Sequence, residues 1–277
     1  MPHPQDKTNS SALTRPRCDQ LPLQPHHPKG SAWGLRGADD ERGTLNLLTE
    51  DVAHTAGSEV SQGRAVNLSH WDGLRHYPYS DSKLFYNGVT QDDISGCKAN
   101  TKIGVKNIAI EPIVTRGILL DWYSYAQREG LACSPFTNQA IPLSHLLQIA
   151  HEAGVTFRQG DVLLIRSGWT AAYQQLSDDE KEQLGGRDDR ASCGVEATEE
   201  SIQWHWEQGF AAVASDTVTY EAWPSPKSWG VSMHECWDLE ELSRTCQALG
   251  RWTFMLTSQP LHVPGGVASP ANAMAIF

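Results

Sequence analysis

The side chains best suited to chemistry in this 277-residue chain lie in one short stretch, Ser69 to Tyr77. His70, Asp72 and His76 place two imidazoles and one carboxylate at offsets of two and four residues. In an extended segment side chains alternate between faces, so these even offsets predict that all three point the same way. Imidazole and carboxylate together suit a divalent metal such as zinc or manganese. An imidazole left without metal could transfer a proton.

Aromatic residues crowd the same stretch, which favours a small-molecule pocket. Gly73 and Pro78 allow the chain to bend around such a pocket. The same features also fit a surface loop at the edge of a hydrophobic core, where two histidines and an aspartate can fall together by chance. The aromatic residues are Trp71, Tyr77, Tyr79, Phe85 and Tyr86.

Composition and charge argue against nucleic-acid-binding and membrane proteins. The formal net charge is -11 and basic residues form no stripe, which argues against a nucleic-acid partner. No apolar run is long enough to span a bilayer, and the N-terminus lacks the apolar core of a signal peptide, so we expect no membrane partner. Residues 1–30 are rich in Pro, His, Gln and Ser and are expected to be a disordered tail. Residues 31–277 are expected to form one domain.

Six cysteines are spread through the chain without a C-x-x-C pair. The chain has enough apolar residues for a core of its own, so we expect reduced thiols in a cytoplasmic protein and no disulfide framework. Three common motifs are also missing: the G-x-G-x-x-G turn, the Walker loop and the G-x-S-x-G elbow. Dinucleotide, nucleoside triphosphate and serine-hydrolase functions therefore lose their usual sequence support.

The elements that must position the chemical residues alternate between helix and strand, which predicts an α/β fold. Apolar runs predict strands at 65–68, 108–110, 113–114, 117–120, 162–167, 210–214 and 252–256, and the chain closes with an apolar run at 273–277. Cap residues and periodicity predict helices at 49–57, 144–154, 171–184, 198–209 and 238–250. Asp121 follows an apolar run, where it could serve a site or cap the next helix. We expect the cap.

Segments along most of the chain resemble the cyclase family of metal-dependent hydrolases. This family includes bacterial-type kynurenine formamidase and isatin hydrolase, and the chain is most similar to a fungal and bacterial subgroup. The resemblance covers nearly everything after the tail, in the family's order. It is carried by residues 43–48, 71–76, 84–88, 116–121, 157–161, 165–169, 210–216, 221–224, 251–254 and 264–270.

The resemblance implies a fold, a reaction and an assembly. The fold is a single cyclase-like domain of the swivelling β/β/α type with a strand-rich core. The activity is hydrolysis of a small-molecule amide or lactone by metal-activated water, as in the arylformamidase reaction of kynurenine formamidase in tryptophan catabolism. The cofactor is a divalent metal, zinc or manganese, and the protein is a homodimer.

The family's metal motif reads H-x-x-x-H-x-D-x-x-x-H. By resemblance, His70 and Asp72 match its second histidine and its aspartate and bind metal, and His76 matches its last histidine and acts as general acid and base. His234 matches a later metal-binding histidine of the family. Glu235 is the candidate for the ligand glutamate that follows it. The expected substrate-binding residues are Trp71, Arg75, Phe85 and Tyr86.

The chain departs from the family pattern at two places. Val66 stands where the family has its first histidine. His234 and Glu235 are adjacent where the family has a longer segment, and adjacent side chains of an extended chain point apart. A mononuclear site made by His70, Asp72 and His234 is one outcome. The other is a catalytically impaired or incomplete family member that binds a small molecule or a partner chain.

Overall fold

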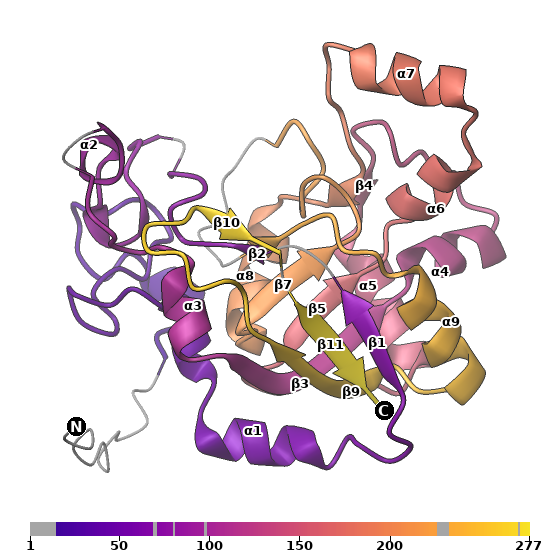
Figure 1. Ribbon diagram of the computed structural model, residues 1–277, viewed down its shortest axis with the longest axis horizontal. Coiled ribbons are helices and arrows are strands. Elements are labelled where there is room, and N and C mark those ends of the chain that lie inside the picture. The colour runs from indigo at the N-terminus through magenta and orange to yellow at the C-terminus, as the bar shows by residue number, and fades with distance from the viewer. Residues whose placement is uncertain (1–14, 69–70, 80, 97–98, 226–232, 271) are drawn as a thin grey trace.

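A mixed sheet of seven strands forms the centre of the computed structural model (Figure 1). The structure describes residues 15–68, 71–79, 81–96, 99–225, 233–270 and 272–277. Strands β3, β5, β7 and β8 run parallel, and β9, β11 and β1 extend the sheet in antiparallel pairs. Across the sheet the order is β1 (Ala65–Leu68), β11 (Ala273–Ile276), β9 (Thr253–Ser258), β3 (Ile113–Leu120), β5 (Val162–Ile165), β7 (Ala212–Ser215) and β8 (Met233–His234).

The central strands are apolar on both faces because helices cover both. On β3, Ile118 and Leu120 join the core under α4 (Trp122–Arg128) and α5 (Leu143–Glu152). Leu119 points the other way, into the core under α9 (Glu240–Leu249). Parallel strands buried in this way need near-continuous apolar sequence. The structure thus confirms the α/β fold with a strand-rich core.

Several helices begin where a polar side chain caps them, as predicted. Thr49 accepts a hydrogen bond from Val52 N at the start of α1 (Glu50–Gly57), which lies beside β3 and β9. Thr198 starts α8 (Glu199–Gln208) in the same way. Asp121 accepts a hydrogen bond from Ser124 N, which confirms its predicted role as the cap of α4.

Two predicted elements are wrong in detail. Residues 108–110 were expected to be a strand but end the short helix α3 (Lys106–Ile110), with Ile110 exposed to solvent. A three-residue apolar run does not distinguish a strand from a buried helical turn. The helix expected at 171–184 is divided into α6 (Trp169–Gln175) and α7 (Asp178–Gly186), because Ser177 forms a capping box with Glu180.

Residues 15–30, which composition predicts to be disordered, lie against α8. Trp206 Nε1 donates a hydrogen bond to Pro16 O at 2.8 Å, and Arg15 Nη2 donates one to Glu207 O at 2.6 Å. Amino-acid composition cannot predict specific contacts such as these with the half-buried Trp206. The disorder expected for residues 1–14 lies outside the described residues.

None of the described helices is long and apolar enough to cross a membrane. Short elements complete the fold. They are η1 (Cys18–Gln20), η2 (Gly43–Leu47), β2 (Trp71–Asp72), η3 (Tyr86–Gly88), α2 (Gln91–Ile94), β4 (Ala140–Ile141), β6 (Gly194–Val195) and β10 (Ala268–Ser269).

Candidate metal centre

A two-stranded ladder holds Asp72. Strand β2 pairs antiparallel with β10, which sets Asp72 opposite Ala268, and Gly73 N donates a hydrogen bond to Val267 O at 2.8 Å. A Cβ atom on Gly73 would lie 3.0 Å from Val267 O and 3.1 Å from Val105 N. Both neighbours are backbone atoms, so any residue other than glycine would have to push the backbone aside. The Asp72 carboxylate is therefore fixed at the start of a tight turn, and its residue is buried.

The turn after Asp72 returns His76 to the same carboxylate. His76 N donates a hydrogen bond to Gly73 O at 2.9 Å, and His76 Nδ1 lies 3.6 Å from Asp72 Oδ1. The expectation that an extended chain aligns these side chains is wrong beyond Asp72, since the extended segment ends there. The His76 side chain is 45% exposed, which leaves it open to water and to small molecules.

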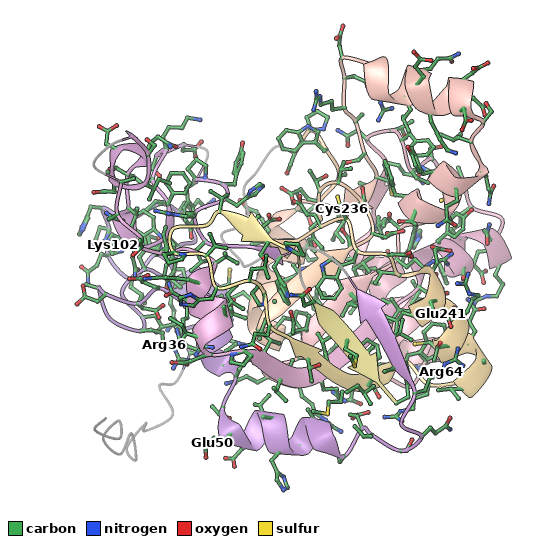
Figure 2. The ribbon with its side chains drawn as sticks, viewed as in Figure 1. Arg36, Glu50, Arg64, Lys102, Cys236 and Glu241 are labelled. Atoms are coloured by element: carbon green, nitrogen blue, oxygen red, sulfur yellow. The ribbon has the colours of Figure 1, made fainter. Side chains whose placement is uncertain are left out.

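The third member of the cluster, Glu235, comes from the far edge of the sheet. It directly follows β8, whose parallel pairing with β7 fixes its position. Cys236 N and Trp237 N then donate hydrogen bonds to Thr217 O and Ser215 O at 2.8 and 2.9 Å. These bonds anchor the chain immediately after Glu235, near the Cys236 that is labelled in Figure 2.

A pair of tryptophans joins the two segments that carry the carboxylates. The rings of Trp71 and Trp237 meet edge to face with centroids 5.4 Å apart, and both residues are fully buried. Trp71 precedes Asp72 and Trp237 follows Glu235 by two residues. As a result, ligand atoms of Asp72, His76 and Glu235 all lie within 4.8 Å of one another.

The charges around this cluster suit a cation. Burial, followed by the negative charges of Asp72 and Glu221, raises the pKa of Glu235 to about 8. Burial also raises the pKa of Glu221 to about 7, and among the described residues Glu221 Oε2 has no hydrogen-bond partner. Carboxylate oxygens and an imidazole nitrogen are suitable donors for zinc or manganese. The residues present therefore fit a divalent cation.

Two of the predicted metal ligands are not placed by the structure. His70 lies outside the described residues, and of His234 only the backbone is described, as part of β8. Their roles stay predictions. Of the predicted metal-site residues, Asp72, His76 and Glu235 are the ones the structure brings together.

The four residues expected to bind substrate lie in the interior. Arg75 donates hydrogen bonds to the backbone carbonyls of Gly265 and Asn100, which fastens the turn that carries His76. Tyr86 donates its hydroxyl hydrogen to Asp40 Oδ2 at 2.7 Å. Contact with substrate stays a prediction for all four, whose exposed fractions are 0% for Trp71, 3% for Arg75, 3% for Phe85 and 9% for Tyr86.

Sequence reasoning did not single out Glu221 as a site residue. The signal that could have found it is its place after β7, because polar residues beyond the carboxyl ends of parallel strands gather at one edge of the sheet. Glu221 follows β7 by six residues, and its charge acts on Glu235.

Comparisons with known proteins agree with this fold. A crystal structure described as a novel cyclase superposes with a TM-score of 0.77 at 24% identity, covering 88% of this chain and 99% of that chain. Isatin hydrolase A from Ralstonia solanacearum gives a TM-score of 0.50 at 18% identity, covering 76% of this chain and 71% of its own. At such identities the likeness shows the fold alone. No curated protein matches the chain.

A family model described as "Putative cyclase" matches residues 22–222. That span contains two members of the cluster, Asp72 and His76, together with Glu221. It is well over half of the chain, and the protein therefore belongs to this cyclase family.

Proposed function

We propose that the protein is a metal-dependent hydrolase that uses water to open a small-molecule amide or lactone. The observation that carries the proposal is the convergence of Asp72, His76 and Glu235 to within 4.8 Å at a half-exposed position. Membership of the cyclase family supports it, as does a fold shared with an isatin hydrolase.

Each residue of the cluster has a distinct task. Asp72 and Glu235 would hold the cation, since burial and the negative charges of Asp72 and Glu221 raise the pKa of Glu235 and a cation would relieve them. A bound divalent cation supplies Lewis acidity and lets water act as a nucleophile at neutral pH. His76 would accept the proton of the attacking water and return it to the leaving nitrogen or oxygen as the C–N or C–O bond breaks. Asp72, 3.6 Å away, would orient the His76 ring.

The finer features of the activity follow from the family and are proposed with it. An aromatic amide of the kynurenine formamidase type is the proposed substrate class. Zinc and manganese both suit the donor set. The proposed assembly is a homodimer, which light scattering on a sizing column would check.

The test is metal content per chain in untagged protein, by elemental analysis. We expect near-stoichiometric zinc or manganese in the wild type and loss of most of it in Asp72→Asn and Glu235→Gln. Glu241→Gln is the matched control, because Glu241 is an exposed carboxylate on α9 whose ion pairs with Arg64 and Arg244 lie at the surface (Figure 2). Full metal content in Asp72→Asn and Glu235→Gln would overturn the proposal.

His76→Ala separates proton transfer from metal binding. If His76 moves the proton, the variant keeps its metal and loses most of the hydrolysis, typically by 10²–10⁴-fold. Loss of metal from this variant would show that His76 is a ligand instead.

A second candidate is a family member that binds small molecules without turnover. The observation in its favour is Val66, which takes the position of the family's first histidine and is buried in β1 opposite Ala275. Because valine cannot bind a metal, this chain lacks one of the metal ligands expected from the family pattern. Absence of metal after incubation with zinc and manganese, in protein that unfolds cooperatively, would favour this candidate over the hydrolase.

A further inference from the structure

A cavity separate from the metal centre lies between the N-terminal segment and α8. Its empty space, including open solvent at the mouth, is about 820 Å³. Residues 15–36 form one wall, and the other walls come from η2, from the chain after β2, and from α8. The lining residues are Arg15, Cys18, Leu21, Gly30, Ala32, Leu35, Arg36, Gly43, Thr44, Leu47, Leu74, Tyr79, Tyr86, Ile202 and Trp206.

Most of this lining is apolar. Leucine side chains from three separate segments face Ile202 and Trp206 of α8 across the space. Burial raises the pKa of the Cys18 thiol, so it is neutral near pH 7 and adds to the apolar surface. The Tyr86 hydroxyl is already engaged with Asp40. The wall of the cavity is therefore mostly apolar.

Two arginines, Arg15 and Arg36, are the charged side chains of the lining. Arg15 is already committed, since its guanidinium donates to Glu207 O at the end of α8 and lies over the Trp206 ring, 5.3 Å from the centroid. Arg36 is half-buried, and no hydrogen bond or ion pair joins its guanidinium to a described residue. Burial is the main reason that the pKa of Arg15 is lowered, and the positive charge of Arg36 adds to it.

A guanidinium that pairs with none of the described residues and lies beside an apolar wall is matched by a ligand with one anionic end and one apolar end. Arginine binds a planar carboxylate through two parallel N–H donors. The apolar part of such a ligand gains by leaving water for the leucine and tryptophan wall. We propose that this cavity binds a small amphipathic carboxylate, held at its charged end by Arg36 and along its chain by Leu35, Leu74, Ile202 and Trp206.

This site is distinct from the metal centre. None of Asp72, His76 and Glu235 lines the cavity. Figure 2 shows Arg36 well apart from Cys236, the residue next to Glu235. Leu74 is the point of contact between the two regions, since it lines the cavity and lies in the turn between Asp72 and His76.

The experiment is titration calorimetry of the full chain with octanoate and with 1-octanol, its uncharged counterpart. Both are titrated into chelator-treated protein, so that a carboxylate cannot bind through a metal. We expect octanoate to bind about tenfold or more tightly than 1-octanol, as a charged hydrogen-bonded pair allows. Arg36→Met should remove this preference and leave 1-octanol binding unchanged, and Arg36→Lys should keep part of it.

The matched control is Arg17→Met, which removes an exposed arginine of the same segment that does not line the cavity. It should bind octanoate like the wild type. Two results would overturn the proposal. One is no binding of octanoate at millimolar concentration. The other is a preference for octanoate over 1-octanol that survives in Arg36→Met.

Discussion

Glu221 and Glu235 are two carboxylates whose surroundings raise their pKa values. Burial is the largest cause at both, and the negative charges of Asp72 and Glu221 add to the rise at Glu235. A buried carboxylate costs free energy when it is ionised without a partner. A divalent cation removes that cost, so the same residues that weaken the empty site favour its occupation.

Glu221→Gln tests this cost directly in metal-free protein. The pKa of Glu221 is about 7 in the folded protein and near 4.5 in the unfolded chain, so the folded state binds the extra proton between these values. Stability is therefore lost as the pH rises from 4.5 through 7. At pH 8 we expect Glu221→Gln to raise the free energy of unfolding by about 1–3 kcal/mol, and at pH 4 to change it little. Urea unfolding of chelated protein at both pH values measures the difference.

Exposed carboxylates provide the comparison for this variant. Glu241→Gln, at the surface of α9, should not reproduce the gain at pH 8. Equal stabilisation by both substitutions would point to the net charge of -11 and not to the buried site.

Two elements that are far apart in the chain depend on each other at the metal centre. Strand β2 is held by β10, and β8 is held by β7, in two separate sheets. The Trp71–Trp237 contact bridges them. Small changes in the backbone of either element should therefore alter metal affinity before they unfold the protein.

Gly73→Ala is such a change. Its new Cβ would lie 3.0 Å from Val267 O and 3.1 Å from Val105 N, and both are backbone atoms that cannot rotate away. Forcing β2 from β10 should cost about 1–3 kcal/mol of stability, as overpacking does, and weaken metal binding by about tenfold or more. Thermal unfolding and competition with a chromophoric chelator measure the two effects.

The matched control is Gly185→Ala. Gly185 lies in α7, where nothing is within 4 Å of an added Cβ atom, so alanine should be neutral or stabilising. Unchanged metal affinity in Gly73→Ala would show that the β2–β10 ladder does not position Asp72.

The sequence predicted the capped helices better than the geometry of the metal centre. Thr49, Asp121 and Thr198 revealed their helices because a cap acts on its own neighbours in the chain. The residue types of the cluster were also readable. Its geometry was not, because His76 returns through a turn and Glu235 arrives from a strand that is about 160 residues away. Glu221 had no local motif at all.

At the scale of the whole molecule, acid should weaken the protein through a histidine buried away from the metal centre. His205 is 3% exposed within the core that joins α8 to the sheet. Its Nδ1 lies 2.7 Å from Ser201 O and its Nε2 lies 2.8 Å from the Tyr220 hydroxyl. Burial lowers the pKa of His205 to about 4, since the charged ring would lose its hydration.

The unfolded chain takes up this proton near pH 6.5 and the folded protein only near pH 4, so stability falls as the pH drops between these values. We expect His205 alone to remove about 3 kcal/mol over that interval. His205→Gln should lower stability at pH 7 by about 1–2 kcal/mol, because the amide replaces the ring imperfectly, and should show a flatter pH dependence. Urea unfolding across the interval measures both, and the difference between variant and wild type cancels the carboxylates that titrate in the same range.

His151→Gln is the control for this slope, because His151 is an exposed histidine of α5 that leaves the core intact. It should follow the wild type at every pH. If His205→Gln kept the full slope, the acid sensitivity would belong to other groups, and the His205 ring would have to accept its proton inside the core. If it flattened the slope, the same buried ring that ties α8 to Tyr220 would set the lower pH limit of the fold.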